Sequence, residues 1–107
     1  MIDSRLASVG AAISIQEGMH VPKAQRAHTP CWTHKNPGNI NVHNNQSYPT
    51  LQLGWQALYD LLYQYRTIHG YTLQEAIYHW APPNENNTET YTQFVEDYTG
   101  INRTEPL

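Results

Sequence analysis

The sequence predicts a mainly helical α+β domain of about four helices, with a long loop and a small β-hairpin after the first helix. Apolar residues recur at helical spacing in separate stretches, and helix start and stop signals bound these stretches. One intervening stretch, residues 20–49, is instead rich in Pro, Asn and His. The chain has 107 residues, which suits one domain, so we expect residues 1–107 to form a single unit.

The first helix is expected from Asp3 to Gln16 or Glu17. Its apolar side chains are spaced four, three and four residues apart, which places them on one helical face. They are Ile2, Leu6, Val9 and Ile13. Gly18 follows and can adopt the left-handed conformation that ends a helix.

The second feature is an irregular region from His20 to Pro49. Several Pro residues and many Asn and His residues predict loops here. A short hairpin is expected from Asn39–Val42 and Tyr48–Leu51, with its turn at His43–Ser47. A loop this long in a small domain is usually functional.

The second helix is expected from about Gln52 to Ile68, with Gly70 ending it. Its apolar side chains again follow helical spacing, which predicts one buried face. They are Leu51, Trp55, Leu58, Leu62 and Tyr65.

The third helix is expected to start at Thr72, because Thr72 and Glu75 match a capping box. Its inner face would carry Leu73, Ile77 and Trp80, and the proline pair Pro82–Pro83 would stop it.

The fourth helix is expected to begin near Asn86 or Asn87, with Glu89 as a capping partner and Gly100 at its end. Its buried face would carry Tyr91, Phe94, Val95 and Tyr98. The tail Ile101–Leu107 is expected to be a surface extension.

Glu17 interrupts the apolar pattern of the first helix. Four residues beyond Ile13, the apolar face arrives at this carboxyl group, at the last turn of the helix. Partial burial and the negative end of the helix dipole both favour the protonated form of a carboxyl group at such a place. A protonated acid near neutral pH is what glycosidic-bond cleavage requires. The alternative is a helix-end Glu that faces solvent.

The composition excludes some classes of partner. Charged residues make up 14% of the chain and the formal net charge is -3, which argues against a nucleic-acid binder that neutralises phosphates. No run of apolar residues approaches the ~20 needed to span a membrane. The 8 Tyr and 3 Trp, against 1 Phe, suit stacking on sugars, although each ring can equally serve the core. No cofactor is indicated.

Five motifs, in one order along the chain, resemble a known family. They are Ile15–Gly18 (IQEG), Val21–Pro22, Asn36–Ile40 (NPGNI), Gly54–Leu58 (GWQAL) and Ala81–Thr88 (APPNENNT) with Tyr91. The series resembles small phage and bacterial proteins of the lysozyme-like superfamily, which are related to lytic transglycosylases. The resemblance covers about Ile13 to Gly100. The chain departs from the pattern at Trp80, where Tyr is common, and at Lys35, where Asn is common.

The resemblance implies a lysozyme-like fold and a role for each matching position. Glu17 would be the catalytic acid and base, with Tyr91 assisting it from the fourth helix. The residues implied to bind the sugar chain are Asn36, Gly38, Asn39, Ile40, Trp80, Pro83, Glu85 and Asn86. Structural roles remain open for several of them: the Asn residues as turn formers, Glu85 and Asn86 as helix caps, and Trp80 and Tyr91 as core rings.

The distribution of acids favours a mechanism with one carboxyl group. Residues 18–59 contain no Asp or Glu, so the loop offers no second carboxylate to Glu17. We therefore expect lytic transglycosylation of peptidoglycan, in which the MurNAc–GlcNAc β-1,4 bond is cleaved and a 1,6-anhydro end is formed. A two-carboxylate hydrolase that uses Glu17 and Glu85 is one alternative.

Two further alternatives belong to other classes. One is a binding or structural module of a virion or secretion device, which grips peptidoglycan without turnover. The other is a zinc site, since His28, Cys31 and His34 are closely spaced, with His20 or His43 as a fourth ligand. The spacing matches no familiar zinc motif, so no metal is assigned.

The expected place of action is the periplasm or the cell wall. The first ten residues lack the basic and apolar stretches of a signal peptide, so delivery by a virion, a secretion device or a parent chain is expected. Cys31 is the single cysteine and allows no internal disulfide. Nothing in the sequence requires more than a monomer.

Overall fold

The computed structural model describes residues 3–41, 44 and 46–107, and this part of the chain is mainly helical. Its helices are α1 (Ser4–Glu17), η1 (Lys23–His28), α2 (Pro30–Thr33), α3 (Leu51–Gln64), η3 (Tyr65–His69), α4 (Leu73–Trp80) and α5 (Thr88–Thr99). η1 is a 3-10 helix, and η3 is a π-helical turn that continues α3. No helix within the described ranges is long and apolar enough to cross a membrane.

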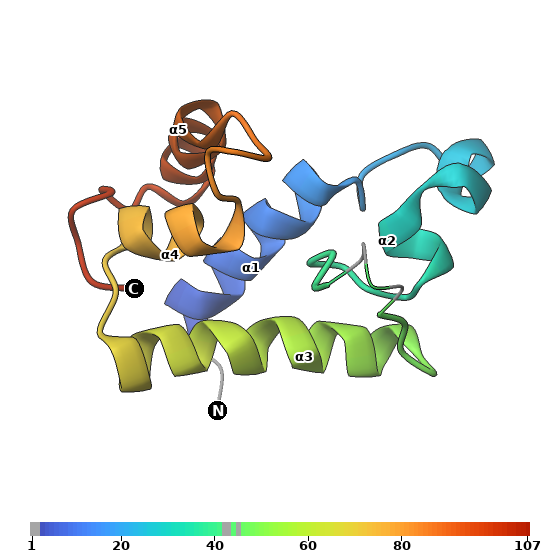
Figure 1. The fold of residues 1–107 in the computed structure, drawn as a ribbon, viewed down its shortest axis with the longest axis horizontal. Helices are drawn as coiled ribbons and strands as arrows, with labels where there is room; N and C mark the ends of the chain where they lie inside the picture. The colour runs from blue at the N-terminus through green and yellow to red at the C-terminus, as the bar shows by residue number, and fades with distance from the viewer. Residues whose placement is uncertain (1–2, 42–43, 45) are drawn as a thin grey trace.

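The helix α1 lies at the centre of the molecule (Figure 1). It packs against both α3 and α5, and α4 packs against α5. The short helices η1 and α2 lie beyond the C-terminal end of α1, at the opposite end of the molecule from α4 and α5. The structure therefore has two lobes, and the end of α1 lies between them.

One apolar core joins α1, α3, α4 and α5. Its members are Leu6, Val9, Ala12, Ile13, Leu58, Leu62, Leu73, Ala76, Ile77, Ala81, Tyr91, Val95, Ile101 and Leu107. Burial of these side chains is the main favourable contribution to folding. The core thus fixes the end of α1 relative to α5, which positions the site described below.

The helix α1 begins and ends where the sequence predicts. The Asp3 side chain accepts a hydrogen bond of 2.9 Å from the backbone N–H of Leu6, which caps the helix. Gly18 ends it with φ 118°, a conformation that favours glycine. Leu6, Val9 and Ile13 are fully buried, as predicted. Ile2, also assigned to this face, lies outside the described residues.

The second predicted helix is divided into α3 and the π-helical turn η3. Leu58 and Leu62 are fully buried, whereas Leu51, Trp55 and Tyr65 are only half-buried. Tyr65 still donates its N–H to the carbonyls of Leu61 and Leu62, so it keeps the register of α3, and it is half-buried because it lies at the edge of the core beside a cleft.

The capping box of the third helix is confirmed. The Thr72 side chain accepts from Glu75 N–H at 3.2 Å, and the Glu75 carboxylate accepts from Thr72 N–H at 3.0 Å. In α5, Asn87 is the cap, but Glu89 pairs with Arg103 instead of completing a box.

Two expectations for the C-terminal region are wrong. Tyr98 is 50% exposed, because the core ends at Val95 on that face of α5. The tail is a docked segment, since Ile101 and Leu107 are buried and the Leu107 N–H donates to the carbonyl of Tyr71 at 3.0 Å. Arg66 holds the end of the tail, with Nε donating to the Leu107 carbonyl at 2.8 Å.

The described residues do not form the expected hairpin. Asn39 and Asn41 have φ values of 49° and 50°, which extended strands do not adopt, and Leu51 already belongs to α3. Within the described part the only β-type pairing is an isolated bridge between Thr72 and Pro106. Val42, His43 and Asn45, where part of the hairpin was expected, lie outside the described residues.

Candidate active site

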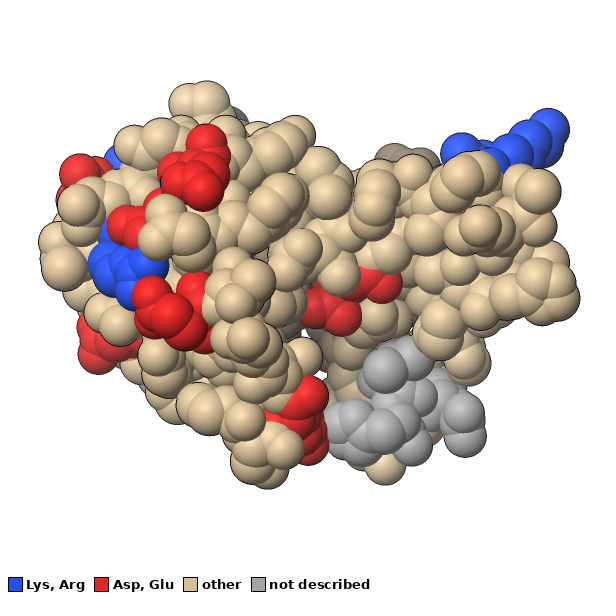
Figure 2. Space-filling view, turned by 90° about the horizontal axis from the view of Figure 1, so that it is seen from above, with Lys and Arg blue, Asp and Glu red and all other residues tan. Residues whose placement is uncertain are grey.

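A cleft of about 420 Å³ lies between the two lobes. Figure 2 shows acidic side chains in the recess between the lobes, and the Lys and Arg side chains of that face at the far ends of the molecule. The cleft is lined by Glu17, Gly38, Asn39, Ile40, Asn41, Leu61, Tyr65, His79, Trp80, Pro82, Glu85 and Asn86. Among the described residues, therefore, the cleft has two carboxylates and no Lys or Arg in its lining.

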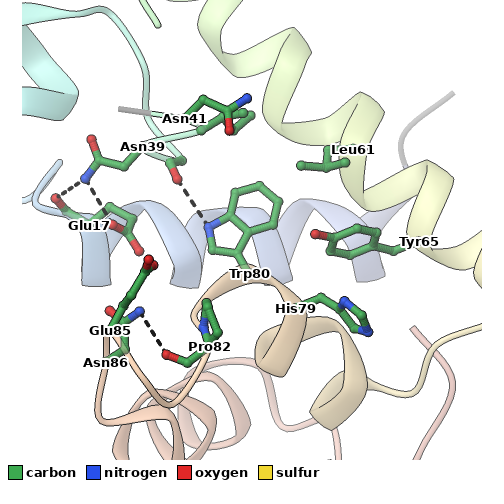
Figure 3. Close-up of a pocket in the computed structure, with 12 residues that line it drawn as sticks. Glu17, Asn39, Asn41, Leu61, Tyr65, His79, Trp80, Pro82, Glu85 and Asn86 are labelled. Atoms are coloured by element: carbon green, nitrogen blue, oxygen red, sulfur yellow. Dashed lines mark hydrogen bonds between the residues drawn. The ribbon is translucent and has the colours of Figure 1, made fainter. Parts of the chain in front are cut away.

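Glu17 lies in this cleft as the last residue of α1. Its Oε2 accepts a hydrogen bond of 2.7 Å from the Tyr91 hydroxyl, and its Oε1 accepts one of 3.0 Å from Asn39 Nδ2. Asn39 Nδ2 also donates to the Glu17 carbonyl at 3.2 Å (Figure 3). The carboxyl group is half-buried and held from two sides, as expected if it continues the apolar face of α1.

Tyr91 acts on the cleft only through Glu17. It is 5% exposed and is not a lining residue. Burial raises the pKa of the Tyr91 hydroxyl well above 10, and the nearby Glu17 charge and its hydrogen bond raise it further. The hydroxyl therefore keeps its proton and donates a hydrogen bond to Glu17, so Tyr91 is a positioning residue instead of one that meets a ligand.

Asn36 and Asn39 have different tasks, although both were assigned to substrate binding. Asn36 is fully buried; its Nδ2 donates to the carbonyls of Ile40 and Gln46 at 2.8 and 3.2 Å, and its Oδ1 accepts from Ile40 N–H at 3.0 Å. It holds the loop in shape and does not line the cleft. Asn39 does line it, and bonds Glu17 from the left-handed conformation that Asn tolerates.

The loop reaches the cleft because Gly54 lets it lie directly on α3. A Cβ on Gly54 would collide with the Lys35 carbonyl and would come within 2.8 Å of Pro37 Cδ. The glycine of the sequence motif thus serves a close approach between helix and loop. This contact precedes Gly38 and Asn39 in the chain and sets their distance from α3.

Trp80 closes the floor of the cleft. Its Nε1 donates to the Gly38 carbonyl at 3.2 Å, and a Cβ on Gly38 would come within 2.6 Å of Trp80 Cζ2. The ring is therefore fixed between α4 and the loop, half-buried, with part of its surface lining the cleft.

The turn between α4 and α5 forms the remaining wall. Its backbone is compact, because the Pro82 carbonyl accepts from the N–H groups of Glu85 and Asn86 at 3.0 and 3.1 Å. Both of these residues line the cleft, and Figure 3 shows the Glu85 side chain directed toward Glu17. Pro83, assigned to substrate binding, is exposed and is not a lining residue; Pro82 lines the cleft in its place.

The structure adds lining residues that the sequence did not assign to the site: Asn41, Leu61, Tyr65, His79 and Pro82. Tyr65 was expected to face the core, and it lies at the edge of the core next to the cleft. His79 follows Tyr78 on the outer side of α4 and carries no sequence signal beyond its aromatic character.

The zinc hypothesis gains no support. In the described residues, no three His, Cys, Asp or Glu side chains gather as a metal would require. Cys31 is fully buried, and burial, with the nearby Glu17 charge, raises the pKa of its thiol to about 11. His34 Nδ1 is hydrogen-bonded to Ser47 Oγ at 2.6 Å. His43 lies outside the described residues.

Comparisons with protein-family models, with curated proteins and with solved structures found no significant match. The argument for function therefore rests on the cleft itself. Chemically, the cleft offers one carboxyl group fixed by two neutral donors, a second carboxylate on the facing turn, and an aromatic floor. Such a set can deliver and accept a proton beside a bound neutral molecule.

Proposed function

We propose that this protein is a lytic transglycosylase with a lysozyme-like fold, which cleaves the MurNAc–GlcNAc β-1,4 bond of peptidoglycan with Glu17 as acid and base. The observation that carries the proposal is the fixation of the Glu17 carboxyl group in the cleft by Tyr91 and Asn39. The motif resemblance assigns the same carboxyl group to catalysis. The lack of cationic side chains in the described lining suits a polymer recognised through hydroxyl and N-acetyl groups.

In the first step, protonated Glu17 gives its proton to the glycosidic oxygen while the bond from that oxygen to C1 of MurNAc breaks. The departing GlcNAc keeps the proton as a hydroxyl group. The N-acetyl carbonyl oxygen of the same MurNAc attacks C1 and forms a cyclic oxazolinium ion, which carries the positive charge.

In the second step, the Glu17 carboxylate removes the proton from the C6 hydroxyl of MurNAc. The C6 oxygen attacks C1, the bond from C1 to the N-acetyl oxygen breaks, and a 1,6-anhydro ring closes. Glu17 ends protonated, as it began, so one group serves as acid and then as base. No water is consumed.

The neighbours of Glu17 fit this double role. Each carboxyl oxygen accepts one hydrogen bond and has a further lone pair, so a proton can occupy one of them while the hydrogen bonds to Tyr91 and Asn39 persist. The carboxyl group then stays in one orientation through both steps. Such fixed geometry lowers the reorganisation that a reaction requires.

A second candidate is hydrolysis, because Glu85 lies in the lining of the same cleft and its side chain points toward Glu17 (Figure 3). In that reaction Glu17 is again the acid, and Glu85 either takes a proton from the water that attacks C1 or attacks C1 itself to form a glycosyl ester, which water then hydrolyses. The products would carry reducing ends.

Mass spectrometry of the muropeptides released from purified sacculi tests the proposal. Transglycosylation yields anhydro ends, which are lighter than hydrolysed ends by one water. Anhydro products that persist in Glu85→Gln support the single-acid mechanism. Reducing ends alone, lost in Glu85→Gln, would establish the hydrolase. If the folded protein binds to sacculi but releases no muropeptides from them, it is a binding module and the proposal is wrong.

A further inference from the structure

The cleft is polar at one end and aromatic at the other. Figure 3 shows Glu17, Asn39 and Glu85 on one side of Trp80, with Tyr65 and His79 on the other. The aromatic end is completed by Leu61 from α3. Glu17 therefore lies toward one end of the cleft, and much of the cleft is built from residues that the proposed chemistry does not use.

The rings at this end hold one another in place. Tyr65 meets Trp80 edge-on, with centroids 6.1 Å apart, and lies 6.3 Å from His79. Tyr71 stacks on His79 at 4.4 Å with an angle of 14° between the rings. His69 stacks on Tyr71 at 4.9 Å. Rings packed in this way lose little freedom when a ligand binds, which favours affinity.

A turn at the end of α3 joins two of these rings, Tyr65 and Tyr71. The π-helical turn η3 begins at Tyr65, and the Tyr65 carbonyl accepts hydrogen bonds from the N–H groups of both Gly70 and Tyr71. The chain thereby folds back so that Tyr71 lies edge-on to Tyr65, with centroids 5.3 Å apart.

The hollow surface continues beyond His79. A second, shallower depression of about 290 Å³ is lined by Gln74, Glu75, Tyr78 and His79. His79 is thus shared by both hollows. The Tyr78 ring is 36% exposed and presents an aromatic surface on the outer side of α4. A ligand that is longer than the main cleft would pass over His79 into the second depression.

We propose that Tyr65 and His79 form a distal saccharide subsite, which binds a hexosamine ring of the glycan strand away from the scissile bond. The inference rests on the proposed function, because it places the strand in the same cleft. The flat C–H face of a sugar ring stacks on aromatic rings, and the ring edges offer hydrogen-bonding groups to its hydroxyls. Affinity then depends on glycan length, since only a longer strand reaches this end.

The test measures binding, so that it is separate from turnover. Chitin oligosaccharides from the dimer to the hexamer are titrated by calorimetry into Glu17→Gln, and into the same variant carrying His79→Ala or Tyr65→Ala. We expect affinity to rise with length in Glu17→Gln. The added substitutions should weaken binding of the longer oligosaccharides about three- to tenfold and leave the dimer unchanged.

Two matched variants serve as controls for effects unrelated to the aromatic surface of the cleft. His79→Phe keeps an aromatic ring and should keep the length dependence. Tyr63→Ala removes a 45% exposed ring of α3 that does not line the cleft, so the affinity for each oligosaccharide should stay unchanged. His79 is itself exposed, so His79→Ala is expected to fold even if Tyr65→Ala does not.

The outcomes separate the two proposals. Affinity that does not depend on length, or a length dependence that survives both His79→Ala and Tyr65→Ala, overturns the subsite. Absence of oligosaccharide binding overturns it as well. If the unmodified protein releases muropeptides, the proposed function stands even when the subsite is overturned. If it releases none, the proposed function is wrong, whatever the binding measurements show.

Discussion

The Tyr91 hydroxyl donates a hydrogen bond of 2.7 Å to Oε2 of Glu17, which joins α5 to the last residue of α1 across 74 positions of the sequence. Tyr91 is almost fully buried, whereas Glu17 lines the cleft. A hydrogen bond from one buried hydroxyl therefore connects the core to the candidate catalytic carboxyl group. The orientation of the carboxyl group depends on how α1 and α5 pack.

Tyr91→Phe tests this connection. The substitution removes the hydroxyl and leaves a carboxyl oxygen without its buried donor, which should cost about 1–3 kcal/mol of stability. We expect kcat on peptidoglycan to fall about tenfold or more with little change in KM, because the ring does not line the cleft. Steady-state kinetics on soluble glycan strands measures the two constants.

Tyr98→Phe is the matched control, since Tyr98 lies on the same helix and is 50% exposed. It should leave kcat, KM and stability unchanged. Equal kinetics for the Tyr91→Phe and Tyr98→Phe variants would show that the hydrogen bond to Glu17 does not support catalysis.

Asn36→Ala should destabilise the fold by about 3 kcal/mol. The substitution leaves the N–H and carbonyl of Ile40 and the carbonyl of Gln46 without their side-chain partner, and it empties the fully buried place of the Asn36 amide. Denaturant titration measures the loss. The exposed Asn84 serves for comparison, because Asn84→Ala should cost almost nothing. A mild effect of Asn36→Ala, with lost sugar binding, would instead indicate direct contact with the ligand.

Gly54→Ala sets two effects against each other. Alanine is favoured over glycine inside a helix by about 1 kcal/mol, but its Cβ would collide with the Lys35 carbonyl. Because the obstacle is backbone, the loop must move, and we expect a net loss of about 2 kcal/mol and a larger loss of activity. Thermal unfolding beside Gln52→Ala, an exposed position of α3, measures the difference. A stabilised Gly54→Ala variant would refute the close approach.

The free energy of unfolding should decrease at acidic pH because Asp3 becomes protonated. The hydrogen bonds from Arg66 lower the pKa of Asp3 from 3.8 to about 2 in the folded protein. A lowered carboxyl pKa means that the charged form is favoured by folding, so its contribution is present above about pH 4 and is lost as the pH falls toward 2. Glu75 and Glu96, whose pKa values are lowered by hydrogen bonds, add to the same trend.

Asp3→Asn isolates this effect, because Asn caps a helix as well as Asp does but carries no charge. Melting temperatures measured from about pH 6 to pH 2 should fall less steeply in this variant than in the unmodified protein. Identical slopes would mean that the Asp3–Arg66 pair does not contribute to the acid sensitivity.

Local rules were sufficient to predict much of the helical structure. The spacing of Leu6, Val9 and Ile13 predicted the buried face of α1, and extending it by four residues indicated that Glu17 continues this face, with a solvent-facing Glu17 as the alternative. The capping box of Thr72 and Glu75 and the glycine ends of the helices also followed from the sequence, because each depends on residues within one turn.

Features that depend on distant contacts were not predictable in this way. An Asn in a turn motif looks the same whether its amide meets a ligand or, like Asn36, the backbone of its own loop. The docked tail depends on Arg66 and Tyr71, which no local pattern connects to Leu107. Likewise, Tyr65 follows the helical register of α3, and the α4 residues and the loop that face it across the cleft are distant in sequence.

The central claim is that the Glu17 carboxyl group performs the chemistry, and Glu17→Gln tests it most directly. The amide occupies nearly the same space but cannot deliver a proton to a glycosidic oxygen. The measurement is the rate of muropeptide release from purified sacculi, with thermal unfolding to show that both proteins are folded. We predict release by the unmodified protein and a loss of about a thousandfold or more in Glu17→Gln. Equal, measurable release by both proteins would contradict the account.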